Sequence, residues 1–195
     1  MKVLNIECKM NVPNALSLVR LLLLPLFVVL FLQSEQQPAL LYASFGVLVL
    51  SGITDVLDGI IARRFNQITP LGKLLDPLAD KVTQMTVVVC LALRYMPIIP
   101  LAVICLVKEL MQGLGGLLLL RRGVKPQGAR WYGKVSTAVF YASMAAILLF
   151  DNMSPILRMA LIALVAVLMV FAFIRYAIEY LRIRRYGVEE DEIKE

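Results

Sequence analysis

Four aspartates between positions 55 and 80 are the residues of this chain whose type and spacing best fit a chemical role. At about 100° per residue, Asp55 and Asp58 share one face of a helix, and Asp76 and Asp80 recur four residues apart on the next. If the two faces meet, four carboxylates converge. Carboxylate oxygens are ligands that suit Mg²⁺ or Mn²⁺. The pattern therefore predicts a site for a divalent cation or a pair of them.

Small residues and an arginine accompany these aspartates. Gly59, Ala62 and Arg63 fall on the face of the first aspartate pair. Gly72 continues the stripe of the second pair, and Thr69 is a suitable cap for that helix. Residues without a large side chain let a ligand approach the backbone closely. We therefore expect a pocket that opens to water between the two helices.

Other kinds of chemistry have less support in the sequence. The chain has no His, which removes imidazole as a metal ligand, as a proton shuttle and as the base of a catalytic triad. Its three Cys residues are far apart, so neither a zinc cluster nor a disulfide framework is indicated.

Two further interpretations of the aspartates stay open. Carboxylates within a membrane can pair with basic residues to fix helix packing, or they can line an ion pathway. A divalent-cation transporter would explain the acidic residues. It would not explain the glycines, the alanine and the arginine at their fixed positions.

The elements that must position these residues are membrane-spanning helices. Of the 195 residues, 60% are hydrophobic and 17% are charged, and apolar runs long enough to cross a bilayer recur along the chain. We predict an all-α membrane protein with one domain over residues 1–195, a short interfacial segment at 1–14 and a charged cytoplasmic tail at 182–195. The six predicted transmembrane helices are Ala15 to Phe31, Ala39 to Ala62, Pro70 to Leu93, Pro100 to Leu120, Gly133 to Phe150 and Pro155 to Ala177.

Basic residues predict the orientation of these helices. Lys and Arg cluster at the N-terminus, in the second and fourth connections and after the last helix, whereas the other connections hold almost none. The positive-inside rule therefore places both termini in the cytoplasm. The net charge of +6 follows from this topology and does not imply a nucleic-acid partner.

The spacing of the motif resembles a known family. The segment reads Asp55-x-x-Asp58-Gly59-x-x-Ala62-Arg63, then eight residues, then Gly72-x-x-x-Asp76-x-x-x-Asp80. It matches the signature of the CDP-alcohol phosphotransferases at every position. The resemblance implies a homodimeric integral membrane enzyme that transfers a substituted phosphoryl group from a CDP-linked donor to an alcohol and releases CMP.

The same resemblance implies roles for the motif residues. Asp55, Asp58 and Asp76 would bind two Mg²⁺ or Mn²⁺ ions, and Asp80 would be a further ligand and the catalytic base. The residues implied to receive the nucleotide are Gly59, Ala62, Arg63 and Gly72.

Further fragments resemble bacterial phosphatidylglycerophosphate synthases. They are the opening Asn11-Val12-Pro13-Asn14 with Arg20, and the run from Asp76 to Lys81. The resemblance implies CDP-diacylglycerol and glycerol 3-phosphate as substrates, and an active site at the cytoplasmic interface of the cell membrane among the membrane lipids. Basic residues on that side could bind a phosphate-bearing acceptor. The candidates are Lys108, Arg130 and Lys134.

One departure from the synthase pattern keeps an alternative open. The stretch from Gly133 to Thr137 resembles a Gly-Lys-x-Lys-Thr pattern of the synthases but has Ser136 in place of the second Lys. It also resembles Gly-Lys-x-x-Thr segments of cardiolipin synthases in the same family, whose acceptor is phosphatidylglycerol. Lys108 with Glu109 likewise stands where the synthases often have an Arg-Glu pair.

Overall fold

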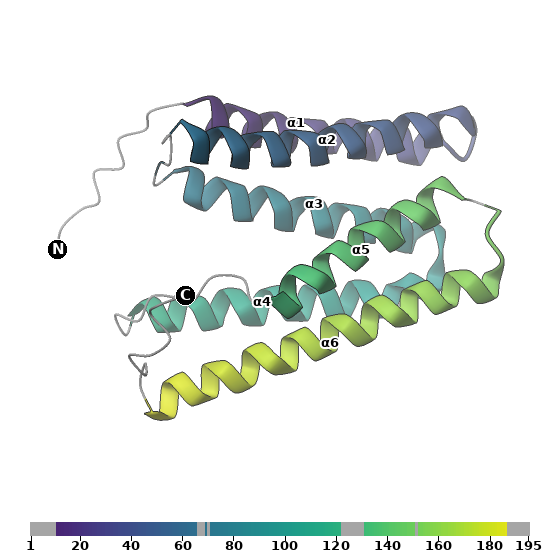
Figure 1. Cartoon of the computed structure of the whole chain (residues 1–195). Coiled ribbons are helices and arrows are strands. Elements are labelled where there is room, and N and C mark those ends of the chain that lie inside the picture. Colours follow the sequence, from purple (N-terminus) through teal and green to yellow (C-terminus); the bar gives the residue numbers. More distant parts are fainter. Residues whose placement is uncertain (1–10, 66–68, 70, 122–130, 151, 187–195) are drawn as a thin grey trace. The chain divides into compact units, whose positions relative to one another are not determined.

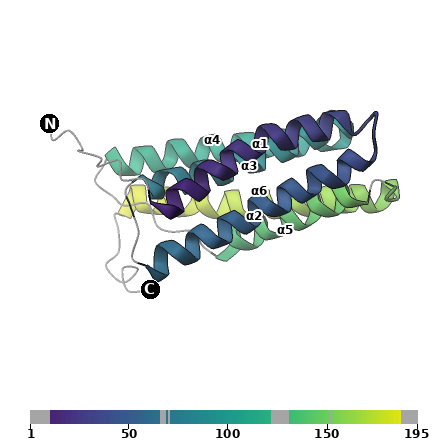
Figure 2. The same ribbon diagram turned by 90° about the horizontal axis from the view of Figure 1, so that it is seen from above.

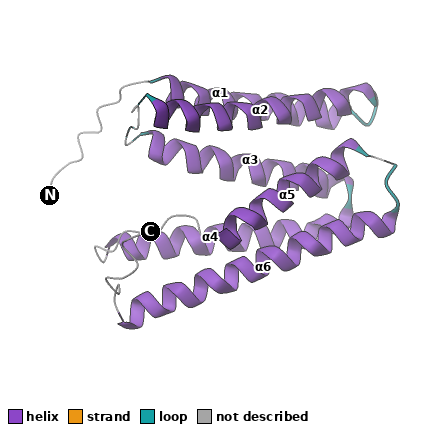
Figure 3. Cartoon of the chain, viewed as in Figure 1, coloured by secondary structure: helices purple, strands orange, loops and turns teal. Residues whose placement is uncertain are grey.

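The computed structural model describes residues 11–65, 69, 71–121, 131–150 and 152–186. Within these ranges every regular element is a helix (Figure 3), which confirms the prediction of an all-α protein. The elements are α1 (Val12–Gln33), α2 (Ala39–Arg64), α3 (Gly72–Arg94), the 3₁₀ helix η1 (Met96–Ile98), α4 (Ile99–Arg121), α5 (Trp131–Leu149) and α6 (Pro155–Tyr186).

Five helical stretches of the described chain are long and apolar enough to cross a membrane. They are Val12–Gln33, Ala39–Ala62, Met96–Gly116, Trp131–Leu149 and Pro155–Ile178. The 23-residue α3 falls within the range of lengths of the other α-helices, but its first part carries Lys73, Asp76, Asp80 and Lys81. Its low apolar content is therefore a direct result of the charges on which the sequence motif depends.

The largest differences from the predicted helix ends are at the start of α1 and at the end of α6. The helix α1 begins at Val12, so residues 12–14 of the predicted interfacial segment belong to it. Pro13 suits this first turn, because a backbone N–H there would have no helical partner. The helix α6 continues to Tyr186, and residues 182–186 of the predicted tail are therefore helical. Residues 1–10 and 187–195 lie outside the described ranges.

The chain divides into two compact units. The first comprises residues 1–94 with 148–151, and so contains α1, α2 and α3. The second comprises residues 95–147 and 152–195, and contains η1, α4, most of α5, and α6.

In the first unit, α1 packs against both α2 and α3 (Figure 1). A short connection after Gln33 turns the chain back from α1 into α2 (Figure 2). One stripe of α1 is buried, with residues three or four apart as expected for a helix that contacts neighbours along one side. The stripe is polar in its first half and apolar in its second, and it comprises Pro13, Asn14, Ser17, Arg20, Leu24, Phe27 and Phe31.

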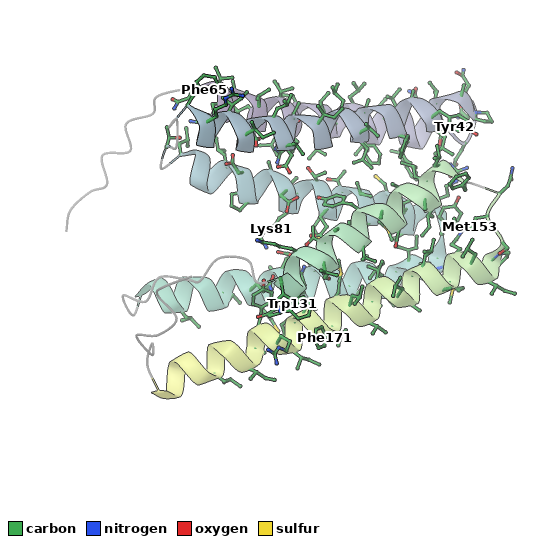
Figure 4. All side chains as sticks on the ribbon, in the orientation of Figure 1. Tyr42, Phe65, Lys81, Trp131, Met153 and Phe171 are labelled. Carbon is green, nitrogen blue, oxygen red and sulfur yellow. The ribbon has the colours of Figure 1, made fainter. Side chains whose placement is uncertain are left out.

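In the second unit, α4 packs against α6, and aromatic side chains gather around the start of α5. The ring of Tyr132 meets that of Tyr176 edge-on with centroids 4.9 Å apart, and it also contacts Trp131 and Phe171. Figure 4 labels Trp131 and Phe171 in this region. A Cβ on Gly133 would lie 3.2 Å from Cζ of Tyr176. Glycine at this position therefore lets the tyrosine ring lie directly against the backbone of α5.

Candidate active site

The helix α2 places Asp55 and Asp58 about one turn apart on one face, as the spacing predicted. The two carboxylates differ in exposure, because Asp58 is 3% exposed while the side chain of Asp55 is 51% exposed. Both contact one nitrogen atom of Arg20. The Nη2 of Arg20 lies 2.6 Å from Oδ2 of Asp58 and 2.7 Å from Oδ1 of Asp55.

Arg20 itself is only 2% exposed. A buried guanidinium loses its hydration and has to be compensated by opposite charge and by hydrogen bonds. The two aspartates supply the charge. The arginine therefore ties α1 to the acidic face of α2.

Ser17 stands one turn before Arg20 on the same stripe of α1 and connects to α3. Its hydroxyl donates to Oδ1 of Asp76 across 2.6 Å, a length typical of a hydrogen bond to a charged oxygen. Oδ2 of Asp58 lies 3.3 Å from the same hydroxyl. Carboxylates from α2 and α3 thus lie on two sides of one serine of α1.

The start of α3 is fixed by Thr69 and Asn14. The Oγ1 of Thr69 accepts the N–H of Gly72 across 3.0 Å, which confirms Thr69 as a helix cap. The same hydroxyl donates to Oδ1 of Asn14 across 3.1 Å. A Cβ on Gly72 would come within 2.7 Å of that amide oxygen. Gly72 is therefore required locally for α1 and α3 to approach each other.

Asp80 lies one turn beyond Asp76 on α3 and is half-buried. Its charge and that of Asp76 both act on Asp55, and the charges of Asp55 and Asp76 act on Asp58. The four aspartates of the motif therefore form one electrostatic cluster in the first unit. Arg20 is the cation that contacts two of them directly.

The acidic groups suit divalent cations by charge and by donor type. Among the described residues, no three acidic side chains are arranged to hold a single ion. The contacts from α1 engage one oxygen each of Asp55, Asp58 and Asp76, whereas a carboxylate has two. Asp55, Asp58 and Asp76 thus supply three carboxylates, two of which contact the guanidinium of Arg20.

Of the four residues implied to bind a nucleotide, the structure describes the burial of three. Gly59 and Ala62 are half-buried near the end of α2, and Gly72 is buried at the start of α3. Arg63 belongs to α2, but its side chain lies outside the described part of the structure.

Two of the three residues predicted to bind the acceptor are described, and both lie in the second unit. Lys108 is 8% exposed, and its Nζ lies 2.8 Å from Oε1 of Glu109, which follows it on α4. Lys134 is exposed in the first turns of α5. Arg130 lies outside the described residues. Lys108 is therefore a buried, ion-paired cation, and Lys134 is accessible.

Sequence reasoning did not assign three residues that contact the motif, namely Asn14, Ser17 and Arg20. Asn14 and Arg20 appeared there as part of a resemblance, and Ser17 did not appear. A stronger signal was available, because Arg20 is the one charged residue in the 22 residues of α1. Such a residue in an apolar helix is by default a candidate for function, with an acidic partner elsewhere.

These features define a class of protein: a multi-pass helical membrane protein with a partly buried acidic site. Residues 10–174 match the sequence profile of the family described as CDP-alcohol phosphatidyltransferase.

Three relatives in bacteria are similar to the chain over most of its length. A protein of Haemophilus influenzae named CDP-diacylglycerol–glycerol-3-phosphate 3-phosphatidyltransferase is 30% identical, over 86% of this chain and 92% of its own. One of the same name in Aquifex aeolicus is 37% identical, over 71% of this chain and 75% of its own. A Streptomyces coelicolor protein named cardiolipin synthase (CMP-forming) is 36% identical, over 77% of this chain and 71% of its own.

The chain belongs to the CDP-alcohol phosphatidyltransferase family. The resemblance in the aspartate motif is thereby confirmed, and the chain is a phosphatidyltransferase of phospholipid biosynthesis. Enzymes of this family generally depend on divalent metal ions. The apolar helices indicate a multi-pass membrane protein, and the bacterial relatives indicate the cell membrane.

Proposed function

We propose that the enzyme transfers a phosphatidyl group from CDP-diacylglycerol to glycerol 3-phosphate, giving phosphatidylglycerophosphate and CMP. The observation that supports this best is the Haemophilus relative, which is aligned over nearly its whole length and carries the corresponding name. The Aquifex relative supports the same acceptor at higher identity.

The reaction is a direct displacement at phosphorus. The acceptor hydroxyl oxygen attacks the phosphatidyl phosphorus and forms the new P–O bond, while the bond from that phosphorus to the oxygen of the CMP phosphate breaks. The proton of the hydroxyl passes to the carboxylate of Asp80, and CMP leaves with the electron pair of the broken bond. Atoms and charge balance without a covalent enzyme intermediate.

The residues of the cluster divide the remaining tasks. Asp55, Asp58, Asp76 and Asp80 would hold two Mg²⁺ or Mn²⁺ ions. When bound, these ions would neutralise the pyrophosphate and the leaving CMP. Gly59, Ala62, Arg63 and Gly72 would receive the nucleotide, with Arg63 donating to a phosphate oxygen. Lys108, Arg130 and Lys134 would bind the phosphate of the acceptor.

The proposal includes a topology. With 23 residues at about 1.5 Å each, α3 is about 34 Å long and can cross the hydrocarbon core of about 30 Å as a sixth transmembrane helix. Its charged first part would then lie at the cytoplasmic interface with the active site, and both termini would be cytoplasmic. In this proposal residues 1–195 form one domain, and two copies form a homodimer.

A second acceptor has a specific observation in its favour. The Streptomyces relative is 36% identical and is named a CMP-forming cardiolipin synthase. The chain also has Ser136 where the synthase pattern has a second lysine, which removes one cation for an acceptor phosphate. Phosphatidylglycerol is therefore the competing acceptor.

The test is CMP release by the purified protein, given CDP-diacylglycerol, Mg²⁺ and one acceptor at a time, with the lipid products resolved. We expect phosphatidylglycerophosphate and CMP with glycerol 3-phosphate, and none from an Asp76→Asn variant. Cardiolipin formed only with phosphatidylglycerol would replace the proposed acceptor by the second. CMP release without either acceptor would show hydrolysis and contradict both.

A further inference from the structure

The carboxylates of the active site are joined through two side chains of α1. Arg20 contacts Asp55 and Asp58, which belong to α2. Ser17 contacts Asp76, which belongs to α3. The extensive helix contacts in this unit are those of α1 with α2 and of α1 with α3. The relative position of the two acidic faces therefore depends on α1.

Ser17 can serve one acceptor at a time. Three oxygens lie near its hydroxyl: Oδ1 of Asp76 at 2.6 Å, the carbonyl oxygen of Pro13 at 3.2 Å and Oδ2 of Asp58 at 3.3 Å. A hydroxyl has one proton to donate. The shortest distance assigns that proton to Asp76, so Oδ2 of Asp58 is compensated by Arg20 rather than by the serine.

The contacts of Arg20 are made through a single nitrogen. Nη2 serves both aspartates, while Nε and Nη1 are buried and have no hydrogen-bond partner within the described part of the chain. Buried donors without partners cost free energy, so this arrangement is not the one that stability alone would favour. The guanidinium thus bridges two carboxylates through Nη2, while its other two nitrogen atoms make no hydrogen bond within the described residues.

We propose that Ser17 and Arg20 are positioning residues that each hold one oxygen of their aspartates and thereby orient the second oxygens toward the divalent cations. This inference rests on the proposed function, since it needs the metal site. Groups that hydrogen-bond metal ligands orient those ligands, and loss of such a group commonly weakens metal binding by about 10–100-fold.

Two effects of α1 on the cations have to be separated. Arg20 orients the carboxylates, but its positive charge also repels a cation. Ser17 is uncharged, so Ser17→Ala changes orientation without changing the charge of the site. Ser44→Ala is the matched control, because Ser44 is a buried serine of α2 whose hydroxyl donates to the carbonyl of Leu41 across 2.7 Å.

The experiment measures Mn²⁺ binding to the detergent-purified protein by the loss of the free-ion EPR signal, without nucleotide or lipid substrate. We expect Ser17→Ala to bind Mn²⁺ about 10-fold or more weakly, Ser17→Thr to restore binding because it keeps the hydroxyl, and Ser44→Ala to match the wild type. Arg20→Lys keeps the charge but loses the planar group that spans two carboxylates, and should also bind more weakly.

The same variants are then assayed for turnover against Mg²⁺ concentration. We expect Ser17→Ala to need more Mg²⁺ for half-maximal activity but to approach the wild-type kcat at saturation. If Ser17→Ala instead turns over more slowly at every Mg²⁺ concentration, saturation included, the defect is purely structural. That result would overturn the inference. Equal Mn²⁺ binding by Ser17→Ala and Ser44→Ala, or tighter binding by Arg20→Lys, would also overturn it while leaving the metal site in place. A wild-type protein that binds no Mn²⁺ would instead overturn the metal site and this inference together.

Discussion

Replacement of Gly72 by alanine tests the contact between α1 and the start of α3. A Cβ there would lie 2.7 Å from Oδ1 of Asn14 and 3.2 Å from Oγ1 of Thr69, both closer than unstrained packing permits. Asn14 is 1% exposed and cannot simply swing into water. We therefore expect Gly72→Ala to displace the asparagine and to break its hydrogen bond with Thr69.

The size of the effect follows from these contacts. Loss of the Thr69–Asn14 hydrogen bond costs about 1 kcal/mol, and a displaced side chain away from its preferred rotamer costs about 0.5–1.5 kcal/mol. Alanine regains part of this, because it favours helix by up to about 1 kcal/mol over glycine in a helix interior. Since Gly72 is the first residue of α3, that gain is smaller here. We expect the free energy of unfolding to fall by about 1–2 kcal/mol, which is about 5–30-fold in the unfolding equilibrium.

Unfolding of the purified protein in mixed micelles with increasing SDS measures this change. Gly52→Ala is the control, since Gly52 lies inside α2, where an added Cβ would meet nothing within 4 Å, and this variant should be neutral or stabilised. A double-mutant cycle with Asn14→Ala isolates the clash. In the Asn14→Ala background, Gly72→Ala should cost almost nothing. If Gly72 also admits the nucleotide to the backbone, Gly72→Ala should still weaken CDP binding in the Asn14→Ala background, where it no longer lowers stability.

Two results would refute this reasoning. The first is a Gly72→Ala variant as stable as Gly52→Ala, because no clash would then exist. The second is an equal cost of Gly72→Ala with and without Asn14, because the strain would then come from another contact.

Three further predictions concern the chemistry and the second unit. Asp80→Asn should lower kcat by about 10²–10⁴-fold, the usual contribution of a general base, while most of the Mn²⁺ binding measured by EPR persists, because the amide oxygen of asparagine and the three other aspartates remain as ligands; near-normal turnover would contradict the base. EDTA should stop CMP release, and added Mg²⁺ or Mn²⁺ should restore it; full activity in the chelator would contradict a metal-dependent reaction. Lys108→Met removes the ammonium group that lies 2.8 Å from Oε1 of Glu109, where the two side chains are 10% and 11% exposed, so the free energy of unfolding should fall by up to about 3–5 kcal/mol. A variant that also carries Glu109→Gln should unfold less readily in SDS than Lys108→Met alone, and equal stability of the two would show that the pair is not what holds this region.

The acidic site could be predicted from the sequence because each pair of aspartates lies within one turn of a single helix. Helical spacing shows which residues share a face, and this placed Asp55 with Asp58 and Asp76 with Asp80. Spacing does not show which helix packs against that face. The prediction that the four carboxylates converge was conditional on the two acidic faces meeting. It did not include the contacts that α1 makes, namely those of Arg20 with Asp55 and Asp58 and that of Ser17 with Asp76.

The residues at which helices end were predicted less accurately than the existence of the helices. The last predicted transmembrane helix ended at Ala177, where the apolar run gives way to charged residues. The helix itself continues to Tyr186, because neither glycine nor proline interrupts it before that point. Hydropathy reports where a bilayer would end, and backbone propensity reports where a helix ends. These are separate properties of the same segment.

The bridge between Arg20 and Asp58 also orders events during biosynthesis. The two residues are 38 positions apart, so at about 5–20 residues per second their synthesis is separated by about 2–8 s. During that interval α1 carries an uncompensated cation in an otherwise uncharged segment, at a cost of about 2.5–3.5 kcal/mol if the charge lies at the bilayer centre and less toward its ends. The arginine can lower that cost by extending toward the interface. Asp55 and Asp58 supply its counter-charge once α2 is made, so the compensation of this buried cation and the first contact between α1 and the acidic face of α2 are the same event.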